Sequence, residues 1–301
     1  MVGCADDGEP REPTPAPSAS PRTSSAPPAA GTRNKPPQPP AVPQPRRMRT
    51  AERLVDQIVA AERAIADPAT PQEVLAAAGH HQQLAYRVLG ARPELERKVL
   101  RAVPDRLVPV VTANVAARRE FRSMHQTLST TLPAWRIVRP PPAEELKAYY
   151  QAAERRFGVD WEYLAAINLV ETGMGRIRGT SVAGAQGPMQ FIPTTWARWG
   201  RGDINSPRDA IMAAARYLDA SGFNRPGGRP GAIFSYNNHP AYVRGVTLLA
   251  QRMERDPRAF LGYYHWQIYY LTREGDVLLP EGYRATKPIP VRRWLAQHPQ
   301  R

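Results

Sequence analysis

The placement of its prolines constrains the fold of this 301-residue chain more than any other feature. Thirteen of the 33 prolines lie in the first 49 residues, among Ser, Ala, Thr and Gln and without the apolar periodicity that a packed core requires. A second group, Arg139-Pro140-Pro141-Pro142, cannot continue a helix. The sequence therefore predicts a disordered tether over residues 1–49 and folded parts on both sides of the linker at 139–142.

The two folded parts differ in composition. Of the 24 Phe, Trp and Tyr residues, 21 lie in 141–301, which predicts that the denser core or a stacking cleft is there. Residues 50–138 are expected to form a helical segment in which Thr50 caps a first helix that ends before Pro68. Its role stays open. Turn residues predict three further helices there, over 72–89, 93–102 and 110–128.

Charge and cysteine content exclude several classes of protein. No run approaches the roughly 18 apolar residues of a membrane-spanning helix. A single cysteine excludes an intramolecular disulfide framework and a multi-cysteine metal site. The net charge of +14 comes mostly from arginine and is shared equally between 1–140 and 141–301. A solvated basic surface explains it best, and attraction to nucleic acid, a membrane surface or the bacterial wall stays the alternative.

The lone cysteine lies in a suggestive position. Val2-Gly3-Cys4-Ala5-Asp6-Asp7 resembles the end of a bacterial lipoprotein signal, and a Pro/Ser/Thr-rich spacer follows it. The apolar region that should precede such a cysteine is missing. Two interpretations stay open: the recorded start lies downstream of the natural one and Cys4 carries lipid, or Cys4 is an incidental thiol.

Glu171 is the candidate catalytic residue. Asp160 is expected to cap a helix in which Leu164, Ile167, Asn168 and Glu171 fall at i, i+3, i+4 and i+7, on one inward face. A carboxyl group partly removed from water near the negative end of a helix should have a raised pKa, as a general acid near neutrality requires. The alternative from the pattern alone is an ordinary exposed glutamate in the last turn.

Three motifs around this residue carry a family resemblance. Glu171-Thr172-Gly173 is followed by Ser-x-x-Gly-Ala-x-Gly-x-Met-Gln over 181–190 and by Ser235-Tyr236-Asn237. In this order they resemble the lysozyme-like (SLT-type) catalytic domain of lytic transglycosylases. The segment from Asp203 to Leu218 also has some similarity to the membrane-bound lytic transglycosylase B subgroup.

The expected fold is therefore mostly α-helical. A lysozyme-like domain is placed at 142–258, and a C-terminal extension follows at 259–301. Within the domain, Ser206-Pro207 predicts a helix start, and Pro240 opens a helix whose apolar face includes Tyr242. In the extension, alternating residues on both sides of Arg273-Glu274-Gly275-Asp276 predict a β-hairpin as the single sheet of the protein.

The resemblance implies a non-hydrolytic cleavage of the peptidoglycan β-1,4 bond between muramic acid and glucosamine. Glu171 would protonate the glycosidic oxygen and then act as base on the C6 hydroxyl of the same muramic sugar, which gives a 1,6-anhydro end. Gln190, Tyr236 and Asn237 would orient the sugar and polarise Glu171, and Ser181 and Met189 would shape the cleft. The expected partners are glycan strands in the cell envelope, with no nucleic acid, metal or cofactor.

Two other functions stay open. Asp203 is the nearest carboxylate downstream of Glu171, and opposite it in the fold it would make a lysozyme-like hydrolase chemically reasonable. The second alternative is a catalytically silent wall-binding module, although such a module would be expected to have lost its glutamate, whereas Glu171 is present.

Overall fold

The computed structural model describes residues 46–181 and 183–300. All of them belong to one compact unit of the chain. The predicted tether over 1–49 lies outside the described residues except for its last four, and Cys4 lies outside them entirely. The described part is mostly α-helical, which confirms the predicted fold class. None of its helices is long and apolar enough to cross a membrane.

The first part of the described chain is a group of helices around its own core. Thr50 caps α1 by accepting from the Arg53 amide, as predicted. The predicted helix 110–128 instead begins at Val108, because Pro109 is tolerated in a first turn that needs no amide donor. It ends earlier than predicted, at Ser123. The elements are α1 (Ala51–Ala66), α2 (Gln72–Ala91), α3 (Pro93–Ala102), a 3₁₀ turn (Asp105–Leu107) and α4 (Val108–Ser123).

A second group of helices forms the largest core. Ser206 caps α8 by accepting from the Asp209 amide, and the face of α10 that carries Tyr242 is buried, both as predicted. The core cluster of this group also includes Phe260 and Tyr263 of α11. The elements are α5 (Ala143–Phe157), α6 (Trp161–Thr172), α7 (Pro193–Trp199), α8 (Pro207–Ala220), α9 (Arg229–Tyr236), α10 (Pro240–Arg255) and α11 (Ala259–Tyr264).

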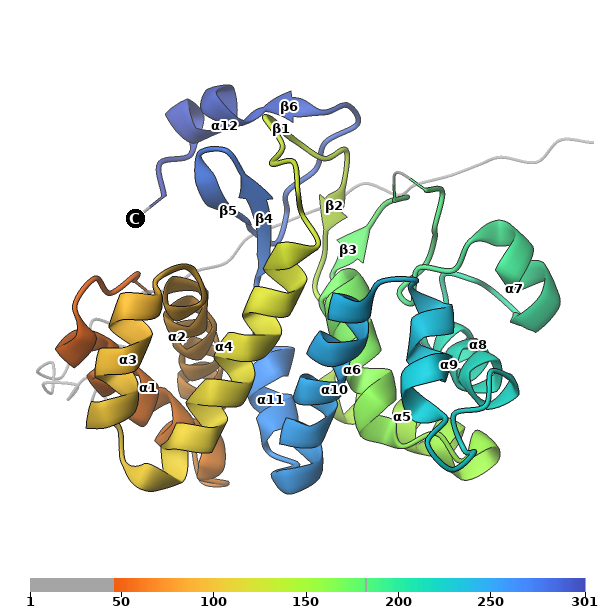
Figure 1. Ribbon diagram of the computed structural model, residues 1–301. Helices are drawn as coiled ribbons and strands as arrows, with labels where there is room; N and C mark the ends of the chain where they lie inside the picture. Colours follow the sequence, from red (N-terminus) through yellow and green to blue (C-terminus); the bar gives the residue numbers. More distant parts are fainter. Residues whose placement is uncertain (1–45, 182, 301) are drawn as a thin grey trace, which may run out of the picture. The chain divides into compact units, whose positions relative to one another are not determined.

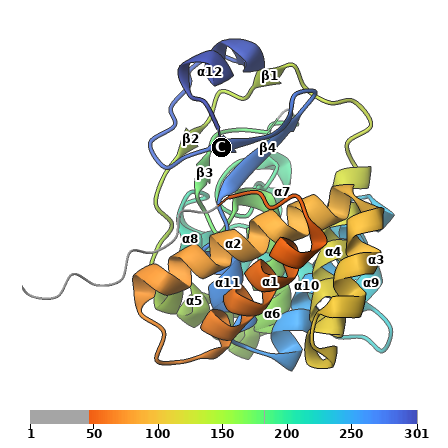
Figure 2. The ribbon, with the colours of Figure 1, turned by 90° about the vertical axis from the view of Figure 1, so that its left-hand side faces the viewer.

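The two groups pack directly against each other. Helix α4 lies along α10, and α2 lies against α11. Figure 2 shows α1 and α2 in front of α11 and α6. Buried polar groups cross this contact: the Tyr263 hydroxyl donates to Asn114 Oδ1 at 2.7 Å, and Trp266 Nε1 donates to Gln82 Oε1 at 2.9 Å. The predicted boundaries at 138, 142 and 258 stay predictions.

The strands of the described residues form three antiparallel pairs. The predicted hairpin is confirmed as β4 (Ile268–Thr272) with β5 (Gly275–Leu279). The expectation of a single sheet is wrong, because β1 (Thr131–Leu132) pairs with β6 (Ile289–Pro290), and β2 (Arg136–Ile137) pairs with β3 (Ile177–Arg178). These two-residue strands show no alternation that a sequence pattern can reveal. A last helix, α12 (Val291–Gln297), follows β6.

We expect Tyr263→Phe to lower the free energy of unfolding by about 1–3 kcal/mol, because it leaves the buried Asn114 oxygen without this donor. Tyr149→Phe is the matched control, since the Tyr149 hydroxyl bonds Glu145 at an exposed position and should cost less than about 1 kcal/mol. Urea denaturation of both variants checks this. Equal losses would mean that the bond between α4 and α11 adds nothing specific.

Candidate active site

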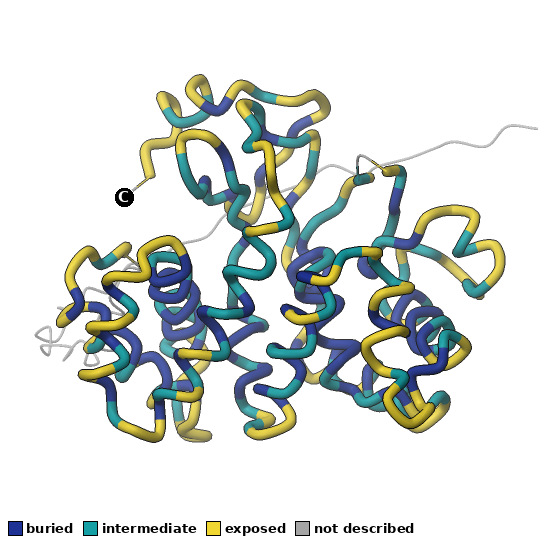
Figure 3. The backbone as a smooth tube through the Cα atoms, viewed as in Figure 1, coloured by how far each residue is buried: buried dark blue, intermediate teal, exposed yellow. Residues whose placement is uncertain are grey.

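Glu171 lies in the last turn of α6, the most deeply buried helix of the second group. The predicted inward positions Leu164, Ile167 and Asn168 are buried. Most other residues of the helix are buried too, so little of its surface meets solvent. In Figure 3 the buried residues follow the inner sides of the helices around it. Glu171 itself is half-buried. The last turn of the helix therefore brings the Glu171 carboxyl group to the edge of the core.

The start of α6 differs in detail from the prediction. The helix begins at Trp161, but the Asp160 side chain makes no capping bond. It pairs with Arg229 Nη2 at 2.5 Å, and Glu154 Oε1 accepts from the Trp161 amide at 3.3 Å in its place. A cationic partner from α9 thus replaces the local cap that the sequence favours.

The electrostatic setting of Glu171 suits proton transfer near neutrality. The pKa of Glu171 is raised to about 7, because burial disfavours the charged form. A hydrogen bond from the Tyr242 hydroxyl acts in the opposite direction and lowers the pKa, but its effect is smaller. That hydroxyl lies 2.6 Å from Glu171 Oε1. Burial, and next the Glu171 charge, raise the pKa of Tyr242 well above its usual value, so the phenol stays the donor. The raised pKa expected from the sequence is confirmed, with burial as its main cause.

The loop after α6 is held to the helix by one buried carbonyl. The Pro188 oxygen accepts from Asn168 Nδ2 at 2.8 Å and from Thr172 Oγ1 at 2.6 Å. The Tyr150 hydroxyl donates to Asn168 Oδ1 at 2.6 Å and fixes the orientation of the amide. Asn168 and Thr172 flank Glu171 in the sequence, so the same turn of helix presents the carboxyl group and positions the loop.

The loop requires its glycine at position 187. Gly187 has a φ of +73°, and a Cβ there would lie 2.0 Å from the Ile204 carbonyl oxygen. Gln190 also adopts a left-handed conformation, with a φ of +50°, and its Nε2 donates to the Gly187 oxygen at 2.9 Å. The Ser181 hydroxyl accepts from the Ala185 amide at 3.0 Å. In this structure both Ser181 and Gln190 therefore bond within the loop.

Tyr236 bonds the loop and lies within reach of the Glu171 charge. Its hydroxyl donates to the Met189 oxygen at 2.7 Å, whereas the Met189 side chain is fully buried in the core. Burial, and next the Glu171 charge, raise the pKa of Tyr236 well above its usual value. Asn237 follows at the end of α9, half-buried, and its side-chain amide bonds none of the described residues.

Aromatic rings surround Tyr236. Its ring centroid lies 5.9 Å from that of Phe191 and 5.8 Å from that of Tyr217, both in edge-on contacts. Trp196 and Trp199 extend the group through Phe191 and Tyr217 respectively. Both tryptophans are half-buried, which leaves ring surface open beside the site.

Asp203 lies in a different setting. It is exposed, and its Oδ1 accepts from the Asn205 amide at 2.9 Å within a turn. Its charge acts on Arg178, and among the described residues no carboxylate affects the pKa of Glu171. Asp203 and Glu171 thus have different hydrogen-bond partners, the Asn205 amide for one and the Tyr242 hydroxyl for the other.

Among the described residues, no group of three His, Cys, Asp or Glu side chains has the arrangement of a metal site. A cavity with a volume of about 920 Å³ is lined by none of the predicted site residues.

Sequence reasoning missed three contributors to the site. The sequence pattern places Tyr242 on an apolar helix face and Asn168 on a buried stripe, and it shows Thr172 only as part of the Glu171-Thr172-Gly173 motif. A tyrosine within a buried stripe was the available signal for the first, because a buried phenol needs a hydrogen-bond partner. The partners themselves are distant in the sequence, since Tyr242 and Glu171 are 71 positions apart.

Comparison with known proteins bears on this site. Residues 148–257 match the family model described as the Transglycosylase SLT domain, which confirms the resemblance stated above. The membrane-bound lytic murein transglycosylase F of Thiobacillus denitrificans is 30% identical over 128 residues, 40% of this chain and 27% of that protein. Its namesake from Nitrosospira multiformis is 27% identical over 146 residues, 46% of this chain and 30% of that protein.

The chain thus spans less than a third of the length of these two relatives. Both carry the designation F, whereas the sequence motifs suggested some similarity to subgroup B. No solved structure matches the chain.

Glu171→Gln should make the protein more stable at high pH. The carboxyl group titrates near 4.5 when unfolded and at about 7 when folded, so folding stability falls as the pH rises between these values. The glutamine variant has no carboxyl group at this position, so its folding stability does not show this fall. We expect little difference from wild type at pH 4 and a gain of up to about 3 kcal/mol at pH 8, measured by urea denaturation. Glu144→Gln, at an exposed position on α5, controls for removal of one charge. A gain equal at both pH values would contradict the assigned pKa.

Tyr242→Phe should raise the pKa of Glu171 above about 7, because burial is then no longer opposed by the hydroxyl. Carbon-13 NMR titration of the glutamate carboxyl groups measures this directly. Tyr217→Phe is the matched control, since its hydroxyl belongs to the same aromatic group but donates to the Ser235 oxygen. A fall in the Glu171 pKa in the Tyr242 variant would overturn the assignment.

Proposed function

We propose that this protein is a peptidoglycan lytic transglycosylase with Glu171 as its general acid and base. One observation carries the proposal: within a segment that matches the SLT domain, a half-buried carboxyl group has a pKa of about 7 and a fixed phenol partner. At neutral pH such a group is present in both protonation states, as a residue that first gives and then takes a proton must be.

The chemistry needs a single carboxyl group. Protonated Glu171 gives its proton to the oxygen of the muramic acid to glucosamine bond as the bond from C1 to that oxygen breaks. The glucosamine end leaves as an alcohol, and positive charge develops on the muramic sugar. The C6 hydroxyl of that sugar then attacks C1 and loses its proton to the Glu171 carboxylate. The product is a 1,6-anhydro ring, no water is consumed, and Glu171 is protonated again.

The setting of Asp203 favours this route over hydrolysis. A hydrolase of the common kind needs a second carboxylate as nucleophile or base. Asp203 is exposed and bonded within its own turn, and its charge acts on Arg178. An internal hydroxyl removes the need for that second group, so the alternative of a lysozyme-like muramidase has less support.

The roles of the surrounding residues are part of the proposal. Tyr242 keeps Glu171 in place through its hydroxyl, and Tyr236, held by the Met189 oxygen, limits the hydration of Glu171. Asn237 offers a side-chain amide without a partner among the described residues. Gln190 meets the sugar if its amide leaves the Gly187 oxygen. Ser181 and Met189 shape the cleft indirectly, because one orders the loop and the other supplies the carbonyl that holds Tyr236.

We further propose that the protein acts in the cell envelope, where its glycan substrate lies. The two relatives are named as membrane-bound murein enzymes, which supports this location. A lipid on Cys4 and the span of the tether would allow the domain to reach the wall from a membrane.

Digestion of purified sacculi tests the activity. We expect wild-type protein to release muropeptides with 1,6-anhydro ends, identified by mass spectrometry, and Glu171→Gln to lose at least about 10³-fold of the rate, since it removes the proton donor. Asp203→Asn should keep most of the activity. Reducing ends that carry the oxygen of labelled water would instead indicate a hydrolase. No product from folded wild-type protein would favour a wall-binding module.

A further inference from the structure

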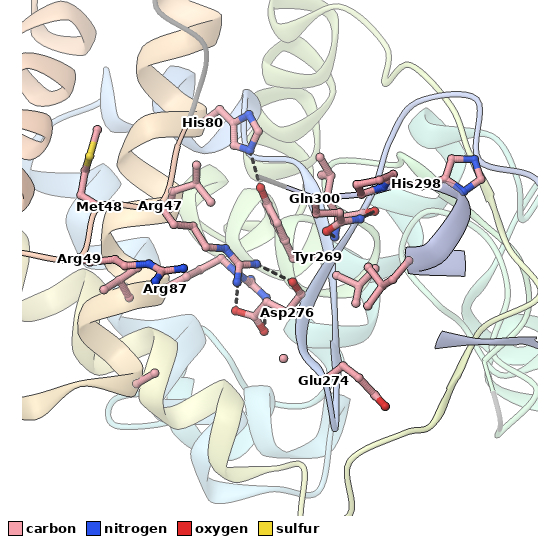
Figure 4. A pocket seen from close by; sticks show the side chains of 18 of the residues that line it. Arg47, Met48, Arg49, His80, Arg87, Tyr269, Glu274, Asp276, His298 and Gln300 are labelled. Carbon is pink, nitrogen blue, oxygen red and sulfur yellow. Dashed lines mark hydrogen bonds and ion pairs between the residues drawn. The ribbon is translucent and has the colours of Figure 1, made fainter. Parts of the chain in front are cut away.

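The cavity of about 920 Å³ lies apart from the candidate active site. Its walls come from α2, from residues 47–49 that precede α1, from Arg122 at the end of α4, from the hairpin β4–β5, and from α12 with the residues that follow it (Figure 4). Nothing in the proposed reaction uses this cavity.

Its walls carry more positive than negative charge. Asp276 of the wall is paired with two guanidinium groups: that of Arg87, also in the wall, at 2.8 Å, and that of Arg118, which does not line the cavity, at 3.3 Å. Burial, and next the charge of Arg118, lower the pKa of Arg87 to about 10. The Arg118 Nε atom is buried and has no acceptor among the described residues. One carboxylate therefore does not balance the buried cations.

Further arginines line the cavity without a carboxylate partner. Arg49 and Arg122 form no ion pair within residues 46–181 and 183–300. The other acid of the wall, Glu274, is already paired with Arg292 at 3.0 Å. An anionic ligand would supply the charge that the wall lacks.

One wall is the outer edge of β5. The Leu278 amide donates to Gln300 Oε1, and the Leu278 oxygen accepts from Gln300 Nε2, both at 2.7 Å. The Asp276 oxygen accepts from Arg47 Nη2 at 2.5 Å. Side chains thus occupy the positions that a third strand would fill. An edge satisfied in this way can exchange its partners for the backbone of an added peptide.

The remaining wall provides apolar surface and a free donor. Leu84, Val88 and Leu295 line the cavity, and Tyr269 lies under the Arg87 guanidinium at 4.6 Å from its ring centroid. The indole Nε1 of Trp294 is buried and has no acceptor among the described residues. A ligand with alternating apolar and acidic side chains matches a wall that is apolar in one place and cationic in another.

We propose that this cavity binds an acidic segment of a partner protein in extended conformation, added as a third strand along β5. Its backbone replaces the Gln300 amide at Leu278. Its carboxylates meet Arg49 and Arg122, and its apolar side chains lie against Leu84 and Val88. The site is a docking surface on the same chain as the candidate active site and does not depend on the proposed reaction.

Fluorescence anisotropy with a labelled Val-Glu-Val-Glu-Val-Glu peptide tests the proposal on the full chain. We expect Arg49→Gln/Arg122→Gln to weaken binding by roughly tenfold or more. Arg155→Gln/Arg208→Gln, at two exposed positions on α5 and α8, removes the same charge and should leave the affinity within about twofold. Gln300→Ala should tighten binding, because it removes the side chain that competes for the edge.

Control ligands separate strand addition from attraction of any anion. A Pro-Glu-Pro-Glu-Pro-Glu peptide keeps the charge but pairs poorly with an edge, and it should bind weakly. Hydrogen exchange of residues 275–279 should slow only with the first peptide. Four results would each overturn the proposal. Two concern the ligand: equal binding of both peptides, or displacement of the peptide by inorganic phosphate that supplies the same total charge. The other two are a loss of affinity in Gln300→Ala and no binding at millimolar peptide.

Discussion

The carbonyl group of Pro188 is the point on which the candidate site depends. It lies inside the core, where an unpaired acceptor is costly, and α6 supplies both of its donors from Asn168 and Thr172. The neighbouring Met189 carbonyl then faces Tyr236, and the turn of α6 that holds the loop also carries Glu171. A single buried acceptor thereby sets the distance between the acid and the loop that closes beside it.

The sequence predicted those features that depend on neighbours along the chain. Thr50 and Ser206 cap their helices, the hairpin forms around Gly275, and Glu171 has the raised pKa that its buried stripe implied. Prediction from the sequence is wrong where a residue distant in the chain takes the place of a local hydrogen-bond partner. Asp160 pairs with Arg229 instead of capping α6, and Tyr242 bonds a carboxyl group from another helix, pairings that only the packed chain creates.

The N-terminal helices support the site indirectly. Tyr242 lies on α10, and Gly245, about one turn further along this helix, packs so closely on α4 that a Cβ there would lie 2.5 Å from the Phe121 ring. Glu62, which also bonds the Tyr86 hydroxyl at 2.5 Å, lies 3.8 Å from Arg252 of α10. The helix that supplies the hydroxyl to Glu171 is thus held in place by the N-terminal segment, whose sequence shows no chemistry of its own.

The buried side chain of Arg176 reaches from the end of α6 to the start of the hairpin. Its guanidinium donates to the carbonyl oxygens of Tyr264 at 2.6 Å and Trp266 at 3.1 Å, and the Ile268 side chain lies so close to Gly173 that no Cβ fits there. A recombinant fragment cut at the limits of the family match, 148–257, would lose all three of these partners. It would leave the Arg176 cation without these acceptors, five residues from Glu171. The smallest fragment worth expressing therefore extends through the hairpin, beyond residue 257, where the family match ends.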